Sequence, residues 1–231
     1  MTFGSLFAGI GGMDLGLERA GMECRWQVEI DPYCQRVLTK HWPDVPKYKD
    51  VRDVGRHNLE PVDLICGGFP CQPVSQAAAR SARSDGWLWP AFARIVEELR
   101  PRFAVVENPA ALRYSRRGLA DILGDLSAIG YDAVWSVLRA SDLGAPHLRA
   151  RLWLVAYPNC DRQPDLSFHD EAFGVQESCG SDRAWSDPPG GVAVANGIPA
   201  TVALRMYGNA VVPQVAEWIG RRIMTASEAP C

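Results

Sequence analysis

The chain has 231 residues, of which 47% are hydrophobic and 22% are charged, and its formal net charge is −3. This length supports one sizeable core, and the composition excludes a disordered chain, a collagen-like fibre and a coiled coil. The longest apolar runs, such as 152–157, fall far short of the roughly 20 residues that cross a bilayer, so no membrane span is predicted. Because no secretion signal follows Met1, we expect a cytoplasmic protein.

Cysteine spacing and the distribution of charge narrow the possibilities further. The seven cysteines include no CxxC pair, which argues against a zinc site and a disulfide framework, so we expect reduced thiols and no bound metal. Between positions 80 and 117 there are eight arginines against four acids, whereas between 158 and 200 seven acids stand against two arginines. The two stretches therefore play different roles.

Strand and helix patterns alternate over the first 157 residues, which is typical of a parallel sheet covered on both faces. Helical periodicity is found at 92–99 and at 119–126, where Gly130 suits the helix end, and it returns at 211–223 with Pro213 in the first turn. We expect this closing helix to pack back on the sheet. The predicted strands are 3–8, 24–29, 62–66, 103–107, 131–138 and 152–157. The sequence thus predicts a doubly wound α/β fold.

The composition changes after Pro158. Until about Pro199 the chain is rich in Asp, Ser, Gly and Pro and has no sustained periodicity. We interpret residues 158–200 as a short loop-rich insertion into a single domain, which is formed by residues 1–157 and 201–231.

A glycine-rich turn follows the first predicted strand, with the sequence FAGIGG at residues 7–12. Glycines in this context let the backbone approach a nucleotide-like ligand closely, and Glu29, twenty residues after Gly9, is placed to bind a ribose hydroxyl. A tight structural turn and a surface acid would explain the same residues. The absence of a GxxxxGK[ST] sequence disfavours a nucleoside triphosphate.

Two further strand ends carry reactive side chains. The sequence GGFPCQPVS at 67–75 puts Cys71 on a rigid turn, where it is either a nucleophile or an inert buried thiol. Glu107 ends the next apolar strand, so it is either a salt-bridged structural acid or a proton donor. Arg149 and Arg151 share one face of an extended segment, which is either functional or a solvated edge.

Taken together, these motifs resemble the cytosine-5 DNA methyltransferase family over about residues 1–157 and 203–224. The resemblance implies a Rossmann-like fold that binds S-adenosylmethionine. It assigns catalysis to Cys71, Glu107, Arg149 and Arg151. It assigns cofactor binding to Phe7, Gly9, Gly11, Gly12, Glu29, Ile30, Asp50, Val51, Pro70, Asn209 and Ala210. It assigns DNA binding to Gln72, Ser75, Arg80 and Arg83.

The resemblance also implies a mechanism. The thiolate of Cys71 attacks carbon 6 of a flipped-out cytosine, carbon 5 takes the methyl group, and Glu107 addresses ring nitrogen 3. Two other functions stay open. One is methylation of transfer RNA, and the other is that of a non-catalytic partner subunit that binds the cofactor.

Three departures from the family pattern are visible. Pro109 stands where valine is usual after Glu-Asn, and His147 stands where glutamine is usual before the Arg-x-Arg motif. The third is the acidic stretch 158–200, which occupies the place of a longer target-recognition region. We therefore expect a compact family member similar to those of phages and prophages. We expect its short form to be natural and its role to lie in restriction-modification. We expect a monomer on double-stranded DNA, with a short recognition sequence, weak affinity or a helper chain.

Overall fold

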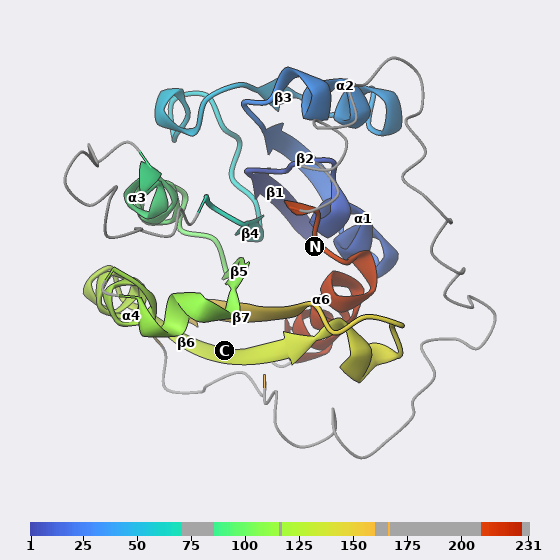
Figure 1. Cartoon of the computed structure of the whole chain (residues 1–231). Coiled ribbons are helices and arrows are strands. Elements are labelled where there is room, and N and C mark those ends of the chain that lie inside the picture. The colour runs from blue at the N-terminus through green and yellow to red at the C-terminus, as the bar shows by residue number, and fades with distance from the viewer. Residues whose placement is uncertain (71–85, 116, 160–165, 167–208, 228–231) are drawn as a thin grey trace.

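The computed structural model describes residues 1–70, 86–115, 117–159, 166 and 209–227. Within these residues one sheet of seven strands has the order β3-β2-β1-β4-β5-β7-β6 (Figure 1). Neighbouring strands are parallel, except that β7 runs antiparallel to both β5 and β6. The strands are β1 (Thr2–Leu6), β2 (Glu23–Val28), β3 (Lys47–Tyr48), β4 (Leu64–Gly67), β5 (Phe103–Pro109), β6 (Tyr131–Arg139) and β7 (Ala150–Pro158).

Helices cover both faces of this sheet (Figure 1). The α-helices are α1 (Gly12–Arg19), α2 (Pro32–His41), α3 (Trp89–Leu99), α4 (Leu119–Ala128) and α6 (Pro213–Ser227). Short 3-10 helices are η1 (Val51–Asp53), η4 (Ala110–Tyr114) and η5 (Ala140–Leu143). Among the described residues, no helix combines the length and the apolar character that a membrane span requires. The α/β fold predicted from the sequence is confirmed.

Alternation along the strands divides the core into two layers. Val105 of β5 packs in one cluster with α1 and α6, and Val106, the next residue, packs in the other cluster with α3 and α4. Successive side chains of a strand point to opposite faces, so each central strand supplies both layers. This explains why the β5 sequence is apolar without interruption from Phe103 to Val106.

The closing helix α6 packs against α1, and its Val215 and Ile219 join the layer that contains Phe3 of β1. The two helices approach closely at Gly16 of α1, where an added Cβ would lie 2.3 Å from the carbonyl oxygen of Pro213. The expectation that this helix returns to the sheet is therefore confirmed.

Several element boundaries differ from the sequence prediction. Strand β1 ends at Leu6 because Phe7 has a φ of 55°, which turns the chain out of the extended conformation. Strand β3 was not predicted, since two partly buried residues at a sheet edge produce no hydrophobic period. The division into a domain of 1–157 and 201–231 with an insertion at 158–200 stays a prediction, because 160–165 and 167–208 lie outside the described residues.

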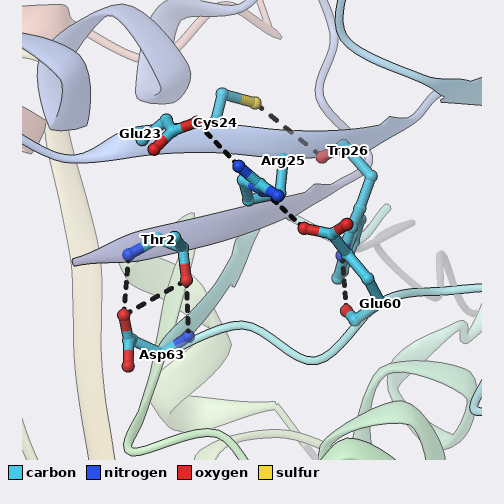
Figure 2. A network of polar contacts seen from close by, with 7 residues as sticks. All are labelled: Thr2, Glu23, Cys24, Arg25, Trp26, Glu60 and Asp63. Atoms are coloured by element: carbon cyan, nitrogen blue, oxygen red, sulfur yellow. Dashed lines mark hydrogen bonds and ion pairs between the residues drawn. The ribbon is translucent and has the colours of Figure 1, made fainter.

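Polar contacts fix the amino ends of the first strands (Figure 2). The carboxylate of Asp63, just before β4, accepts hydrogen bonds from the backbone N–H of Thr2 at 2.7 Å and from its hydroxyl at 3.1 Å. Arg25 of β2 forms ion pairs with Glu23 at 2.8 Å and with Glu60 at 2.5 Å. These contacts hold the edge of the sheet opposite to the strand ends where the glycine-rich turn lies.

Candidate functional site

A cavity of about 630 Å³ opens at the carboxyl ends of β1, β4 and β5. Its size is within the range of small-molecule sites, and open α/β sheets bind ligands at this edge. The walls come from seven segments that are distant in sequence: 5–10 with 12–13, 28–31 with 34, 49–52, 67–70 with 88, 107–109, 149 with 151, and 209–211.

The glycine-rich turn forms the floor on one side of the cavity. Gly9 has a φ of 57° and is open to the cavity, since no described heavy atom lies within 4 Å of the place that an added Cβ would take. Its backbone N–H donates to Oε2 of Glu29 at 2.7 Å, and Oε1 of Glu29 accepts from the N–H of Asp31 at 2.8 Å. Burial raises the pKa of Glu29, and these amide bonds partly offset that effect. The carboxylate thus ties the turn to the end of β2 and lines the cavity.

Gly11 and Gly12 occupy different positions in this turn. Gly11 does not line the cavity: its φ is 82°, and an added Cβ would lie 2.4 Å from the Trp42 ring. Gly12 lies under the C-terminal segment, because an added Cβ would be 2.4 Å from the carbonyl oxygen of Val211. The neighbouring Asn209 and Ala210 line the cavity.

Because β3 pairs with β2, the wall that carries Glu29 also contains Ile30, Asp50 and Val51, which the sequence assigned to the cofactor. The side chain of Ile30 is 56% exposed, so it offers an apolar surface to the cavity. Asp50 is already paired with Arg52, whose Nη2 lies 2.6 Å from Oδ2, and this hydrogen bond is the main cause of the lowered pKa of Asp50. Arg52 and Lys49 also line the cavity and were not predicted.

Glu107 lies on the opposite wall and is 7% exposed. Burial raises its pKa to about 7, against the opposing effects of Arg151 and Arg149. Nε of Arg151 is 3.0 Å from Oε1 of Glu107, and Arg149 donates to the carbonyl oxygen of Ala210 at 2.5 Å. The sequence left open a salt-bridged acid or a proton donor, and this geometry has the features of both.

Two buried polar residues near the cavity were missed by the sequence prediction. Asn108 lines the cavity at 1% exposure, and neither side-chain polar atom has a hydrogen-bond partner within the described part of the chain. Asp14 lies behind the glycine-rich turn and accepts from Nε2 of Gln27 at 2.7 Å and from the Ser5 hydroxyl at 3.1 Å. In both cases the sequence offered the same weak indication, a polar residue next to the apolar residues of its element.

The proposed nucleophile and the proposed DNA contacts lie outside the described residues, namely Cys71, Gln72, Ser75, Arg80 and Arg83. Pro70, the last described residue before them, lines the cavity together with Gly68, and an added Cβ on Gly68 would lie 3.1 Å from Oε2 of Glu107. The described part of the turn that leads to Cys71 therefore passes Glu107 at Gly68.

The fold and cavity define a class, that of Rossmann-like methyltransferases. In this chain the antiparallel strand β7 lies between β5 and β6. Residues 1–178 match the family of C-5 cytosine-specific DNA methylases, and the chain belongs to this family.

Similar proteins agree with this assignment. The Type II methyltransferase M.DsaV of Dactylococcopsis salina is 33% identical over 68% of this chain and 46% of its own length. The Type II methyltransferase M.HhaI of Haemophilus parahaemolyticus is 32% identical over 69% of this chain and 50% of its own length. The chain therefore spans about half the length of these curated relatives.

Solved structures give the same fold. A prophage-encoded E. coli protein, described as a DNA modification methyltransferase, has a TM-score of 0.58 and 29% identity over 68% of this chain and 47% of that one. The Dnmt2 methyltransferase of S. pombe also has a TM-score of 0.58, over 71% of this chain and 50% of that one. Its identity is 18%, so this likeness concerns the fold alone.

Proposed function

We propose that this chain transfers a methyl group from S-adenosylmethionine to carbon 5 of a cytosine flipped out of duplex DNA. One observation carries the proposal: a single cavity joins the wall of Gly9 and Glu29 to the wall of Glu107 and Arg151. The first wall suits a nucleoside-containing cofactor, and the second suits a polar ring that must be protonated. Membership of the C-5 cytosine-specific DNA methylase family supports the same activity.

The residues of the first wall fit the cofactor. The open position at Gly9 leaves room for close approach, while the remaining lone pairs of the Glu29 carboxylate can accept hydrogen bonds from ribose hydroxyls. The exposed Ile30 side chain can pack against an adenine ring, and Asp50 can accept from its amine. When bound, the cofactor supplies a methyl group on a positively charged sulfur.

The second wall supplies the proton. With a pKa of about 7, Glu107 is protonated in a substantial fraction of molecules at neutral pH, so it can donate to ring nitrogen 3 of cytosine. Arg151 fixes one carboxyl oxygen at 3.0 Å and thereby orients the other. Protonation at this nitrogen draws electrons from carbon 6, where a nucleophile attacks.

We assign that nucleophile to Cys71. Its thiolate forms a bond to carbon 6 while nitrogen 3 takes the proton of Glu107, which makes carbon 5 electron-rich enough to accept the methyl group. The proton on carbon 5 then passes to water, the electron pair of the bond between sulfur and carbon 6 returns to the Cys71 thiolate, and nitrogen 3 gives its proton back to Glu107, which restores the aromatic ring. The base must leave the helix for this attack, at a cost of a few kcal/mol.

Target recognition is a separate part of the proposal. We assign it to residues 158–200, which are net acidic and short compared with the additional length of the relatives. Because phosphate contacts supply most non-specific affinity, binding must then depend on the arginines of the catalytic part.

The test is transfer of labelled methyl groups to mixed-sequence duplex DNA and, in parallel, to total RNA. Wild-type protein should label the duplex, and Cys71→Ser should not. A duplex that contains 5-fluorocytosine should form a covalent adduct with the wild type only, because the fluorine cannot leave as a proton does. Labelling of RNA alone would mean that RNA is the substrate. The absence of both label and adduct would contradict the proposed activity.

A further inference from the structure

A positively charged segment follows β5, whose last residue, Pro109, lines the cavity. The 3-10 helix η4 begins directly after Pro109, which lines the cavity, and exposes Arg113 and Tyr114. Arg117 follows and is also exposed, while the Tyr114 side chain is 79% exposed. We refer to Arg113, Tyr114 and Arg117 as the rim patch.

The backbone that carries the rim patch is anchored from below. Leu112 is fully buried in the layer that contains α3 and α4, and the N–H of Ser115 donates to its carbonyl oxygen at 3.1 Å. Gly118 packs so closely that an added Cβ would lie 2.3 Å from the same carbonyl oxygen. The rim patch is therefore presented on a fixed support, which lowers the entropy cost of binding a ligand there.

Among the described residues, no acid forms an ion pair with the arginines of the rim patch. From 108 to 120 the sequence has three arginines and no acid, although the whole chain has a net charge of −3. Across the described residues, Arg113 and Arg117 have no ion pair, whereas Arg25, Arg94 and Arg151 each pair with a glutamate. Exposed cations without an acidic partner among the described residues attract an anionic ligand.

The rim patch also holds one guanidinium in position. The guanidinium carbon of Arg113 lies 4.6 Å from the centre of the Tyr114 ring. Stacking on an aromatic face restrains the plane of the guanidinium and leaves its N–H edge available for two parallel hydrogen bonds to a phosphate. Tyr114 can therefore position Arg113 without contacting the ligand itself.

From these observations we infer that the rim patch binds backbone phosphates of the DNA strand beside the flipped cytosine. Arg113 and Arg117 each contact a phosphate, and Tyr114 is a positioning residue that acts through Arg113. This inference rests on the proposed function, because it takes DNA as the substrate of the neighbouring cavity. It adds a docking surface built from residues that the recognised motifs do not include.

The experiment measures the affinity for a labelled cytosine-containing duplex at several salt concentrations, with S-adenosylhomocysteine present. Each phosphate contact contributes about 0.9 to the slope of log K against log salt concentration. The double variant Arg113→Gln/Arg117→Gln should therefore reduce that slope by about 1.8, and each single variant by about half as much. Tyr114→Ala should weaken binding, and Tyr114→Phe should restore it because the ring is retained.

The matched control is Arg100→Gln/Arg102→Gln. These exposed arginines lie at the amino end of β5, the opposite end of the strand that leads to the rim patch, and Arg102 also lies over a ring, that of Phe103 at 6.0 Å. This control removes the same charge and should leave the salt slope at the wild-type value. Melting temperature and cofactor affinity, measured on every variant, identify any loss of folding.

Two results would overturn the inference while leaving the proposed function intact. One is a wild-type protein that forms the 5-fluorocytosine adduct while the rim double variant keeps the wild-type salt slope. The other is an equal loss of slope in the rim variant and in the control, which would mean that only total charge matters. A wild-type protein without measurable duplex binding or adduct would instead reject the proposed function itself.

Discussion

The carboxyl group of Glu107 gains and loses its proton near neutral pH because burial opposes its negative charge more than Arg151 and Arg149 favour it. If the protonated form donates to the substrate, kcat/KM for methyl transfer should fall as the pH rises through about 7. A pH profile of initial rates measures this limb.

Glu107→Gln is the matched variant for that profile. It keeps the size of the side chain but cannot transfer a proton, so we expect a rate at least about 100-fold lower with no falling limb near neutral pH. A wild-type rate that stays constant across this range, or a variant that retains the limb, would remove Glu107 from the proton-transfer step.

Asp14 is a second buried acid whose pKa is raised by burial. Burial raises its pKa from 3.8 to about 6, so the folded state binds this proton more tightly than the unfolded state does. The free energy of unfolding that this tighter proton binding contributes is therefore lost as the pH rises from about 4 to about 6. Asp14→Asn removes the titrating carboxyl group, and its amide can donate to Oε1 of Gln27, an atom without a partner among the described residues.

Urea unfolding at about pH 5 and at about pH 7.5 tests this expectation. Over that interval the wild type should lose on the order of 1 kcal/mol of unfolding free energy relative to Asp14→Asn. An identical pH dependence in the two proteins would show that the Asp14 carboxyl has the same pKa folded and unfolded.

At the level of single residues, the sequence identified those whose type is distinctive at a strand end. Glu29 and Glu107 are acids at the carboxyl ends of predicted strands, and the structure brings both to one cavity. Asn108 and Asp14 were missed because a polar residue next to apolar ones is a weak sign of burial until the neighbouring elements are known. Gly11 was assigned to the cofactor because turn glycines share one pattern, whereas the structure places it against Trp42.

Among the elements, α1 and α6 pack with no room for an added side chain at Gly16. An added Cβ on Gly16 would lie 2.3 Å from the Pro213 carbonyl oxygen and 2.5 Å from Cβ of Ala216. Gly16→Ala must therefore separate the helices, and we expect a loss of about 1–3 kcal/mol in the free energy of unfolding. Denaturant unfolding measures it.

Gly124 of α4 provides the matched helix control. An alanine there meets no atom within 4 Å, and the site is exposed, so Gly124→Ala should raise stability by up to about 1 kcal/mol. Equal effects of the two substitutions would mean that helix propensity, and not the approach of α6, decides the outcome at Gly16.

The long elements were predictable because their patterns are local. The periodicity of 92–99 and 119–126 lies within α3 and α4, and Gly130, with a φ of 79°, follows the end of α4 as expected. Strand β3 was not predictable, since its pairing with β2 depends on the neighbouring strand more than on its own two residues. The position of the antiparallel β7 between β5 and β6 also depends on contacts across the sheet.

For the molecule as a whole, the cavity links segments that are far apart in the chain, from Ser5 to Val211. A ligand that binds only the folded state should therefore stabilise the entire fold, by about 2.7 kcal/mol at a concentration 100 times its Kd. For a protein of this size we expect S-adenosylmethionine to raise the Tm by roughly 5–10 °C. Thermal unfolding with and without the compound measures the shift.

Glu29→Ala should remove most of that shift, because a charged hydrogen bond contributes about 1.5–3 kcal/mol to affinity. Glu97→Ala, an exposed acid on α3 that does not line the cavity, should retain it. An unchanged shift in Glu29→Ala would exclude this carboxylate from the cofactor site.

The close contact between Gly12 and the Val211 carbonyl has a consequence for biosynthesis. A ribosome adds residues from the amino end, so the glycine-rich turn emerges about two hundred residues before the segment that covers it. A nascent chain can form β1, β2 and β4 early, but its ligand pocket lacks a wall until 209–211 have left the exit tunnel. Protection of the growing polypeptide by its own small-molecule ligand is thus expected only after residues 209–211 have emerged.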